Sequence, residues 1–372
     1  MIPQWQQDII NSKIQNYVYS VEWLNKKEEV IKEVILDVIS GNVNFDATNN
    51  SRISCNLTLK NLDKKYIPSS DGLMQMSNRF RLKAGYEYGN GESLLFNQGI
   101  LCLGNPSLLS SPTQKEATIQ GLDKWNLING TLGGTLQSKY IIPINTRIDT
   151  VIKNIVTDLM DEPKYIIDSC STLTPYTIEK EPNTKISDII IELCDMVSYQ
   201  AFYDNNGYFR FRKALKPEDY NSTPVGWYYT TSGIYLQGKR DVNWIDVRNS
   251  IAVYGETLPD GTVVYALAES STGSDFSIDE IGLKPDIITD TNIYDDTLAQ
   301  ERADYELQQK IMVAETIDSD VVPNFSHVLE DIINITDENN GANGNYVLQN
   351  ISYNLSHDTS MSLGVWAIRN WS

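Results

Sequence analysis

The sequence predicts a mainly β protein in which two β-barrel domains flank a small α/β domain. Three observations support this prediction. Tyrosine is unusually frequent, at 21 of 372 residues, and tyrosine, isoleucine and threonine favour strands. The 22 glycines favour turns between many short apolar runs. Helical periodicity is confined to a few segments, two of which lie close together in the middle of the chain.

Residues 1–143 are predicted to form the first, tube-like β-barrel domain. Its clearest strand is Arg52–Lys60, because alternate residues from Ile53 to Leu59 are apolar and the residues between them are polar. Turn-rich stretches separate this strand from further strands, predicted at Tyr17–Trp23, Val30–Ile39, Asn42–Asp46, Arg79–Tyr86, Ser93–Leu103, Ala117–Leu122 and Tyr140–Ile144. Residues 2–16 are predicted to form an amphipathic helix with Ile9, Ile10 and Ile14 at helical spacing.

Residues 144–213 are predicted to form a small α/β domain. Its first helix has an apolar stripe, could be capped by Asn145 or Thr146, and ends near Pro163. The stripe is Ile148, Ile152, Ile155 and Leu159. The second helix has a broader apolar face of Ile186, Ile189, Ile190, Leu193, Cys194 and Val197. A hairpin follows, since Asn206-Gly207 is a strong tight-turn signal.

Residues 214–372 are predicted to form a connector and the second β-barrel domain. A hairpin is expected around the turn at Pro259–Gly261, and one helix near 297–313. The final strands are predicted at Asp331–Thr336, Tyr346–Leu355 and Met361–Ile368.

The net charge of −19 is concentrated at the end of the chain. Residues 1–150 carry 15 basic and 14 acidic groups, whereas 251–372 carry 4 basic and 21 acidic groups, a net of −17. A surface that grips nucleic acid needs the opposite sign, because its affinity comes from neutralising phosphates. This acidity therefore indicates either plain solubility or a surface that lies near nucleic acid without holding it.

The sequence shows no export signal, no apolar run long enough to span a bilayer, and no disulfide framework. The four cysteines, Cys55, Cys102, Cys170 and Cys194, are widely spaced and contain no C-x-x-C pair. We therefore expect reduced, partly buried thiols in a protein made in a cytoplasm.

No catalytic or metal-binding motif is found. His327 and His357 belong to no ligand or triad signature, and we expect both to be surface or capping residues. Asp161-Glu162 is expected to be solvated at a helix end, although paired carboxylates elsewhere remain open as hydrolase groups. The Asp/Asn clusters at 290–296 and 337–345 could ligate Ca²⁺ through their oxygens, although neither fits the usual calcium loop with its closing Glu. The aromatic run Trp227–Tyr229 indicates strand packing, or stacking on sugars.

Three stretches resemble one family, the baseplate or tail-tip hub proteins of phage tails, related to the spike-base proteins of type VI secretion. Residues 96–130 resemble the closing strands of a first hub barrel and end in an Asp-plus-aromatic turn at Asp123–Trp125. The helices of 144–213 and their Asn-Gly hairpin resemble the middle α/β domain. Residues 321–366, with an acidic turn and a Gly-rich hairpin, resemble the last strands of a second barrel.

This resemblance implies a structural protein without enzymatic activity or cofactor. Three chains would form a ring of six barrels that matches a six-fold tail tube on one side and a three-fold spike or fibre on the other. The partners would be two further copies, the tail tube or distal tail protein, and the spike, fibre or tape-measure protein. DNA would pass through without specific binding, and the protein would reside in the virion tail after assembly in the host cytoplasm. A tail-associated cell-wall hydrolase and a carbohydrate-binding adhesion module remain the alternatives.

Overall fold

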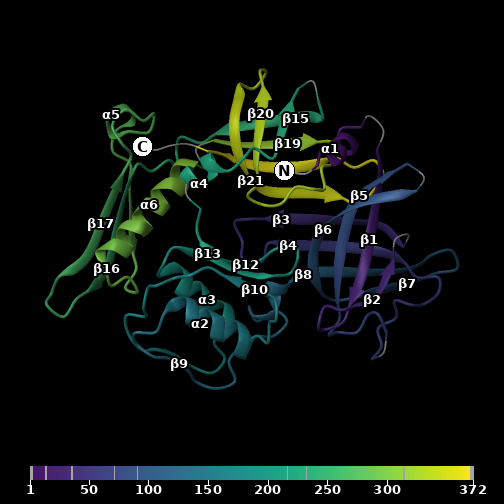
Figure 1. Cartoon of the computed structure of the whole chain (residues 1–372), viewed down its shortest axis with the longest axis horizontal. Helices are drawn as coiled ribbons and strands as arrows, with labels where there is room; N and C mark the ends of the chain where they lie inside the picture. Colours follow the sequence, from purple (N-terminus) through teal and green to yellow (C-terminus); the bar gives the residue numbers. More distant parts are fainter. Residues whose placement is uncertain are drawn as a thin grey trace.

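The protein is mainly β, and its largest element is a single sheet of fourteen strands (Figure 1). The structure, a computed structural model, describes residues 3–12, 15–34, 37–70, 72–89, 91–215, 217–231, 233–312 and 315–368. The N-terminal strands of the sheet are β1 (Asn16–Leu24), β2 (Val30–Val34), β3 (Val38–Asp46), β4 (Ile53–Lys60), β5 (Arg79–Tyr88), β6 (Glu92–Leu103), β7 (Ser107–Ser110) and β8 (Lys115–Asp123). The C-terminal strands are β14 (Trp227–Thr230), β15 (Tyr235–Val242), β19 (Glu315–Val321), β20 (Ile332–Asp337), β21 (Ala342–Asn354) and β22 (Met361–Ala367).

The two ends of the chain join in the middle of this sheet. β21 pairs antiparallel with β3, from Asn350 opposite Asp46 to Asn354 opposite Asn42. The strand order is β15-β19-β22-β21-β3-β4-β8-β6-β5-β1-β2, and β20 and β7 pair at the side of this path with β21 and β8. The strands predicted for two barrels therefore lie in one continuous sheet, and the described strands do not close into a barrel. One hydrophobic core, which includes Leu57 and Ile351, serves both halves.

The predicted alternation of the fourth strand is confirmed. Ile53, Cys55, Leu57 and Leu59 are buried, and the residues between them are exposed or half-buried. The N-terminal helix is shorter than predicted, since α1 spans Gln4–Ile10. Ile10 is buried and Ile9 packs on the core, whereas Ile14 lies outside the described residues.

The middle of the chain folds around its own core, with a three-stranded sheet of β10 (Tyr165–Ile167), β13 (Phe209–Lys213) and β12 (Tyr199–Tyr203). Helix α2 (Ile148–Asn154) continues as the π-helical turn η2 (Ile155–Leu159), and α3 is Ile186–Asp195. The predicted face of α3 is confirmed, because all six of its predicted residues are buried. The predicted cap of α2 is wrong: the N-cap position is Arg147, and no side chain caps it. The core also includes Trp125, from the 3₁₀ turn η1 (Lys124–Leu127), and Ile142, from β9 (Tyr140–Ile142), which pairs with β11 (Ile178–Lys180).

A further unit lies within the segment predicted to be the second barrel. We call it the β16–α6 unit; it consists of residues 250–312. Its strands are β16 (Ser250–Thr257), β17 (Val263–Glu269) and β18 (Pro285–Thr289), and its helices are α5 (Ile278–Ile281) and α6 (Asp296–Met312). The predicted hairpin is confirmed, with Gly261 in its turn at φ +86°. The unit has a separate core and sits at one end of the molecule's long axis (Figure 1).

The remaining helix, α4 (Pro217–Ser222), lies in the connector between β13 and β14. No helix in the described part of the chain is long and apolar enough to cross a membrane. All four cysteines are free and buried, which agrees with the expected reduced thiols.

Candidate functional site: a polar sheet face and its buried supports

The main sheet has one strongly polar face, which runs over seven neighbouring strands from β15 to β8. In most of these strands alternate residues enter the core and the residues between them point to the other side, whereas β15 is buried only at Tyr235 and takes its place through its pairing with β19. We call this side the polar face; it is formed by Gln237, Lys239, Asp318, Asp320, Ser362, Gly364, Asn350, Ser352, Asn42, Asn44, Ser54, Asn56, Thr58, Thr118 and Gln120.

Strand register places the polar residues in rows across both halves of the chain. Ser352 lies opposite Ser362 on one side and opposite Asn44 on the other. Asn44 in turn lies opposite Ser54. The side chains in these rows are short, so the face carries no bulky groups along its middle. Two chain segments more than 300 residues apart thus form one continuous surface.

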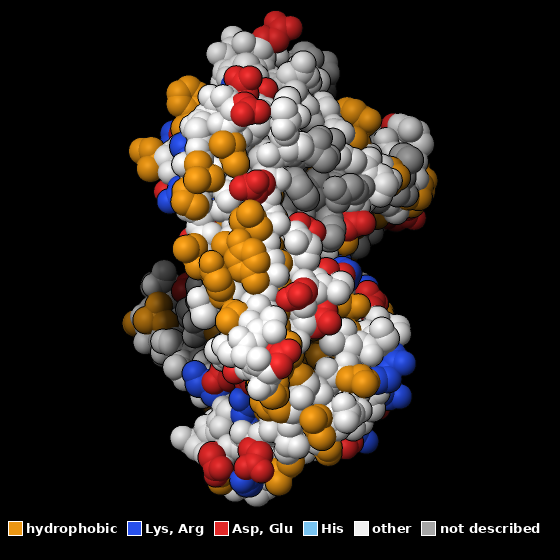
Figure 2. Space-filling view, turned by 90° about the vertical axis from the view of Figure 1, so that its left-hand side faces the viewer, with side chains coloured by type: hydrophobic (Ala, Val, Ile, Leu, Met, Phe, Trp, Pro, Cys, Tyr) orange, Lys and Arg blue, Asp and Glu red, His pale blue; other side chains and the backbone are white. Residues whose placement is uncertain are grey.

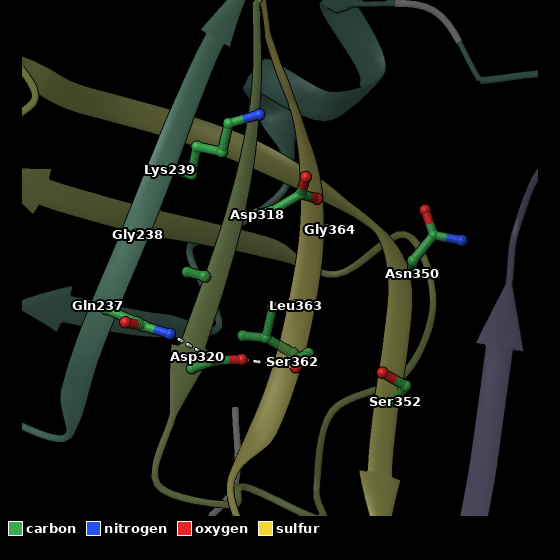
Figure 3. Close-up of a pocket in the computed structure, with 11 residues that line it drawn as sticks. Gln237, Gly238, Lys239, Asp318, Asp320, Asn350, Ser352, Ser362, Leu363 and Gly364 are labelled. Atoms are coloured by element: carbon green, nitrogen blue, oxygen red, sulfur yellow. Dashed lines mark hydrogen bonds between the residues drawn. The ribbon is translucent and has the colours of Figure 1, made fainter.

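The C-terminal part of the polar face forms a shallow hollow of about 510 Å³ (Figure 3). Asp320 orients two of the side chains that line the hollow, because its carboxylate accepts hydrogen bonds from the Gln237 amide at 2.6 Å and from the Ser362 hydroxyl at 2.5 Å. Gly364 lies opposite both Asp318 and Asn350, and its missing side chain opens the hollow between them. The hollow is therefore an open part of the face and not an enclosed ligand pocket.

The polar face is nearly neutral. Its fifteen residues include two carboxylates, Asp318 and Asp320, and one ammonium group, Lys239; at the strand ends the same side continues with Asp241 and with Lys60 opposite Glu116. The strong acidity lies elsewhere, because the β16–α6 unit has 13 acidic and 3 basic residues, a net of −10. A face with so few cations lacks the positive charge from which binding to a phosphate backbone gains most of its affinity.

A buried ion cluster fastens the main sheet to the α/β core beside it. The Lys124 ammonium, which is fully buried, lies 2.6 Å from Glu28 and 2.7 Å from Glu162. Burial alone would raise the pKa of Glu28, but Lys124 and Lys164 outweigh burial and hold it below its ordinary value. Tyr203 closes the cluster by donating its hydroxyl to Glu162 at 3.2 Å and offering its ring to Lys124.

A second cluster joins three parts of the chain. Glu330, before β20, pairs with Arg52, before β4, at 3.1 Å, and also pairs with Arg212 of β13. The Arg52 guanidinium stacks on the Phe202 ring, 3.4 Å from its centroid. Because each arginine belongs to a different region and shares one carboxylate, the cluster fixes the α/β unit against the sheet that carries the polar face.

Comparisons with known proteins identify this architecture. No family model matches the sequence, and no curated protein matches it. Solved structures do match. The 43 kDa tail protein of prophage MuSo2 from Shewanella oneidensis has a TM-score of 0.63 at 13% identity, covering 94% of this chain and 98% of that chain. The tail protein from Neisseria meningitidis MC58 has a TM-score of 0.66 at 10% identity, covering 95% and 97%. The chain has the fold of phage tail proteins.

The tail-protein fold extends to secretion machines. The Escherichia coli c3393 protein matches with a TM-score of 0.50 at 9% identity, covering 90% of this chain and 74% of that chain. It is described as a type VI secretion component similar to the T4 phage tail proteins gp27 and gp5. The resemblance predicted from the sequence is therefore confirmed at the level of the fold.

Within the tail-protein fold, two residues expected at the surface are buried. His327 was expected to be a surface or capping residue, but its Nε2 lies 2.7 Å from the Tyr229 hydroxyl inside the core. Glu162 was expected to be solvated, but it belongs to the Lys124 cluster because η2 ends beside that lysine. His357 is exposed, as expected.

The other sequence-based candidates act as packing or turn residues. Trp227 and Tyr229 are buried and Tyr228 is 66% exposed, so the aromatic run is a strand that packs on the core. The acidic clusters at 290–296 and 337–345 form turns, and the described residues contain no group of three or more side chains suited to a metal ion. Asp123 receives backbone N–H groups of Trp125, Arg52 and Ile53, which explains the Asp-plus-aromatic turn.

Proposed function

We propose that this protein is the structural hub of a phage tail tip or baseplate, located in the virion tail. Three copies form a ring that adapts a six-fold tail tube to a three-fold spike or fibre. The observation that carries this proposal is the continuous polar face, to which the N-terminal and C-terminal halves of each chain contribute neighbouring strands. The strands within residues 16–123 and those within 227–242 and 315–367 then supply the two tube-like parts of each subunit, and the α/β core lies beside them.

The polar face lines the passage of this ring. DNA that slides through the ring needs a wall that does not bind its phosphates. Extended protein that passes the same way needs a wall without apolar surface. Short amide and hydroxyl side chains meet both conditions, because they keep a water layer and carry little charge. The polar face has only one lysine among its fifteen residues.

The open edges of the sheet supply the contacts between subunits. β15 is the end strand on one side, and β7 lies beyond β8 on the other side of the polar face. Both edges expose leucines: Leu236 is 58% exposed, Leu108 45% and Leu109 50%. Exposed apolar edge strands favour pairing with another chain, so β15 of one subunit would meet β7 of the next and close the ring, with β2 at the far end of the sheet outside this contact.

A reconstruction of the assembled tail tests this proposal. We expect three copies in one ring, with the polar face toward the axis and both β halves of each subunit in the wall. The tail tube or distal tail protein should contact one side, and the spike, fibre or tape-measure protein the other. One copy, six copies, or a ring with its polar face on the outside would contradict the hub.

The hub proposal includes the absence of hydrolytic activity. The buried acidic residues support this part of the proposal, because Glu28 and Glu162 are neutralised by Lys124 and Asp123 is held by backbone N–H groups of Arg52, Ile53 and Trp125. Zymography on Gram-positive and Gram-negative peptidoglycan tests it. Clearing that is lost on replacing a single Asp or Glu would favour a cell-wall hydrolase instead.

A further inference from the structure

The outer face of the β16–α6 unit is apolar. Its sheet, in the order β17-β16-β18, packs one side on α6 and leaves the other uncovered. On the uncovered side Tyr254 is 39% exposed, Tyr265 42%, Leu267 41% and Ile287 64%. Figure 2, which views the molecule from the end that carries this unit, shows hydrophobic side chains gathered into patches with acidic groups among them.

Strand β17 turns two of its large apolar residues to the uncovered side of the sheet. It turns Tyr265 and Leu267 outward, and it turns the small residues Ala266 and Ala268 inward toward Ala303 of α6. Since side chains alternate, a slip of one residue would bury the large residues and expose the small ones. The hydrophobic effect within this chain therefore does not account for the outward Tyr and Leu, and a contiguous exposed patch of this kind marks an interaction site.

The apolar residues are adjacent across all three strands. Leu267 of β17 lies opposite Ala252 of β16, which lies opposite Ile287 of β18. In the next row Tyr265 and Tyr254 are paired, with ring centroids 5.0 Å apart. These residues form one surface, which we call the outer patch.

The charges around the outer patch have one sign. Its three strands contain Glu256, Glu269 and Asp286 and no Lys or Arg, and of these Asp286 lies on the α6 side of the sheet, paired with Lys310. The three basic residues of the unit are engaged elsewhere: Lys310 with Asp286, Arg302 with Asp195 and Glu306, and Lys284 with the Trp244 carbonyl. Two copies meeting through this patch would bring together two units of net −10 each, which opposes self-association.

We propose that the outer patch docks a second protein through a segment whose apolar strip is flanked by lysine or arginine. The apolar strip covers Tyr254, Tyr265, Leu267 and Ile287, and the cations meet the carboxylates around them. This interaction goes beyond the hub function, because the patch belongs to the acidic β16–α6 unit and not to the polar face or to the β7 and β15 edges. The proposed docking does not depend on whether the three-subunit ring forms.

The experiment uses the full chain with a fluorophore at Thr289→Cys, an exposed position opposite Tyr254. The label is selective because the native cysteines are buried, and burial raises the pKa of Cys55 to about 12 and of Cys102 to about 11. The probes are two synthetic amphipathic peptides with identical leucine positions, one with lysines and one with glutamates on the flanks. We expect an emission shift with the lysine peptide only.

Matched variants assign the binding to the patch. Leu267→Ser combined with Ile287→Ser should weaken the lysine peptide roughly tenfold or more, since two buried side chains are lost. Glu269→Gln should weaken it at low salt. Met76→Ser is the control, because Met76 is 88% exposed and lies outside the patch. Equal binding of both peptides, or equal loss in the Met76 variant, would overturn the proposal. Sedimentation showing self-association that the double variant abolishes would assign the patch to a second copy.

Discussion

Lys124 is the residue on which the junction between the main sheet and the α/β core depends. Its ammonium group is fully buried and is shared by Glu28 and Glu162. Replacing it by Met would leave the buried Glu162 carboxylate without its cation and would leave Glu28 with only Lys164 and Arg79. We expect Lys124→Met to lower the free energy of unfolding by about 3–5 kcal/mol, the usual cost of breaking a buried ion pair.

The control for this substitution is Lys139→Met. Lys139 also has two acidic neighbours, Glu179 and Glu181, but its side chain is 42% exposed. Water screens such a pair, so its loss should cost far less than the loss of Lys124. If urea unfolding showed similar losses of unfolding free energy for both variants, burial of the Lys124 cluster would not contribute more to stability than an exposed ion pair does.

Glu28 makes the same junction sensitive to acid. Its pKa in the folded protein lies below the ordinary value of 4.5, so the folded state binds its proton less readily than the unfolded state does. The resulting stabilisation is complete above the unfolded value and is lost as the pH falls through the lower, folded value. Unfolding free energies measured between pH 7 and pH 3 should therefore fall more steeply for the native chain than for Glu28→Gln. Glu338→Gln, at an exposed position, should keep the native slope.

Helix α3 carries the core of the α/β unit. Ile190 and Leu193 are completely buried, so an aspartate at either position places an unpaired charge in an apolar core. We expect Ile190→Asp or Leu193→Asp to cost about 3 kcal/mol or more, and Ile190→Val to cost only about 0.5–1.5 kcal/mol. Thermal melts in which both aspartate variants lose less than about 0.5 kcal/mol would refute the buried face.

The exposed leucines of the edge strands β7 and β15 should contribute to assembly but not to the stability of the single chain. Leu108 and Leu236 are exposed in the single chain, so Leu108→Lys and Leu236→Lys should leave the melting temperature nearly unchanged. Lysine on an edge strand opposes pairing with another strand, so neither variant should enter the tail ring. Leu62→Lys, at a leucine 57% exposed outside both edges, should still assemble. Normal assembly of the two edge variants, scored by electron microscopy of tails, would contradict the proposed contact.

At the scale of the whole molecule, the near-neutral polar face makes a prediction about DNA passage. Asn44 and Ser352 lie directly opposite each other on this face. Asn44→Lys with Ser352→Lys adds two cations per chain, which bind phosphates and should slow DNA release from assembled particles several-fold, most strongly at low salt. Asn44→Ser with Ser352→Asn is the matched control. Unchanged release in the lysine variant would mean that DNA does not travel along this face.

Local sequence patterns determined much of the protein. The alternation from Ile53 to Leu59, the apolar stripe of α3 and the Asn-Gly hairpin each depend on neighbours within a few residues, and all three are present as predicted. The resemblance to tail hub proteins was also visible, because it rests on the order of such local patterns along the chain. The sequence also shows the polar residues of the sheet face, as the polar positions that alternate with apolar ones in each strand, but it does not show that these strands lie side by side.

Only the tertiary structure decided how these elements combine. The pairing of β21 with β3 joins residues more than 300 positions apart, and no local period encodes it. It turns two predicted barrels into one sheet and makes one continuous polar face. Burial of Glu162 and His327 was missed for the same reason, since their partners Lys124 and Tyr229 are distant in sequence. The sequence assigned the β16–α6 unit to a barrel because its hairpin has the same local pattern as a barrel hairpin. The unit is separate because its strands pack on α6, and this contact between distant residues cannot be seen in a local pattern.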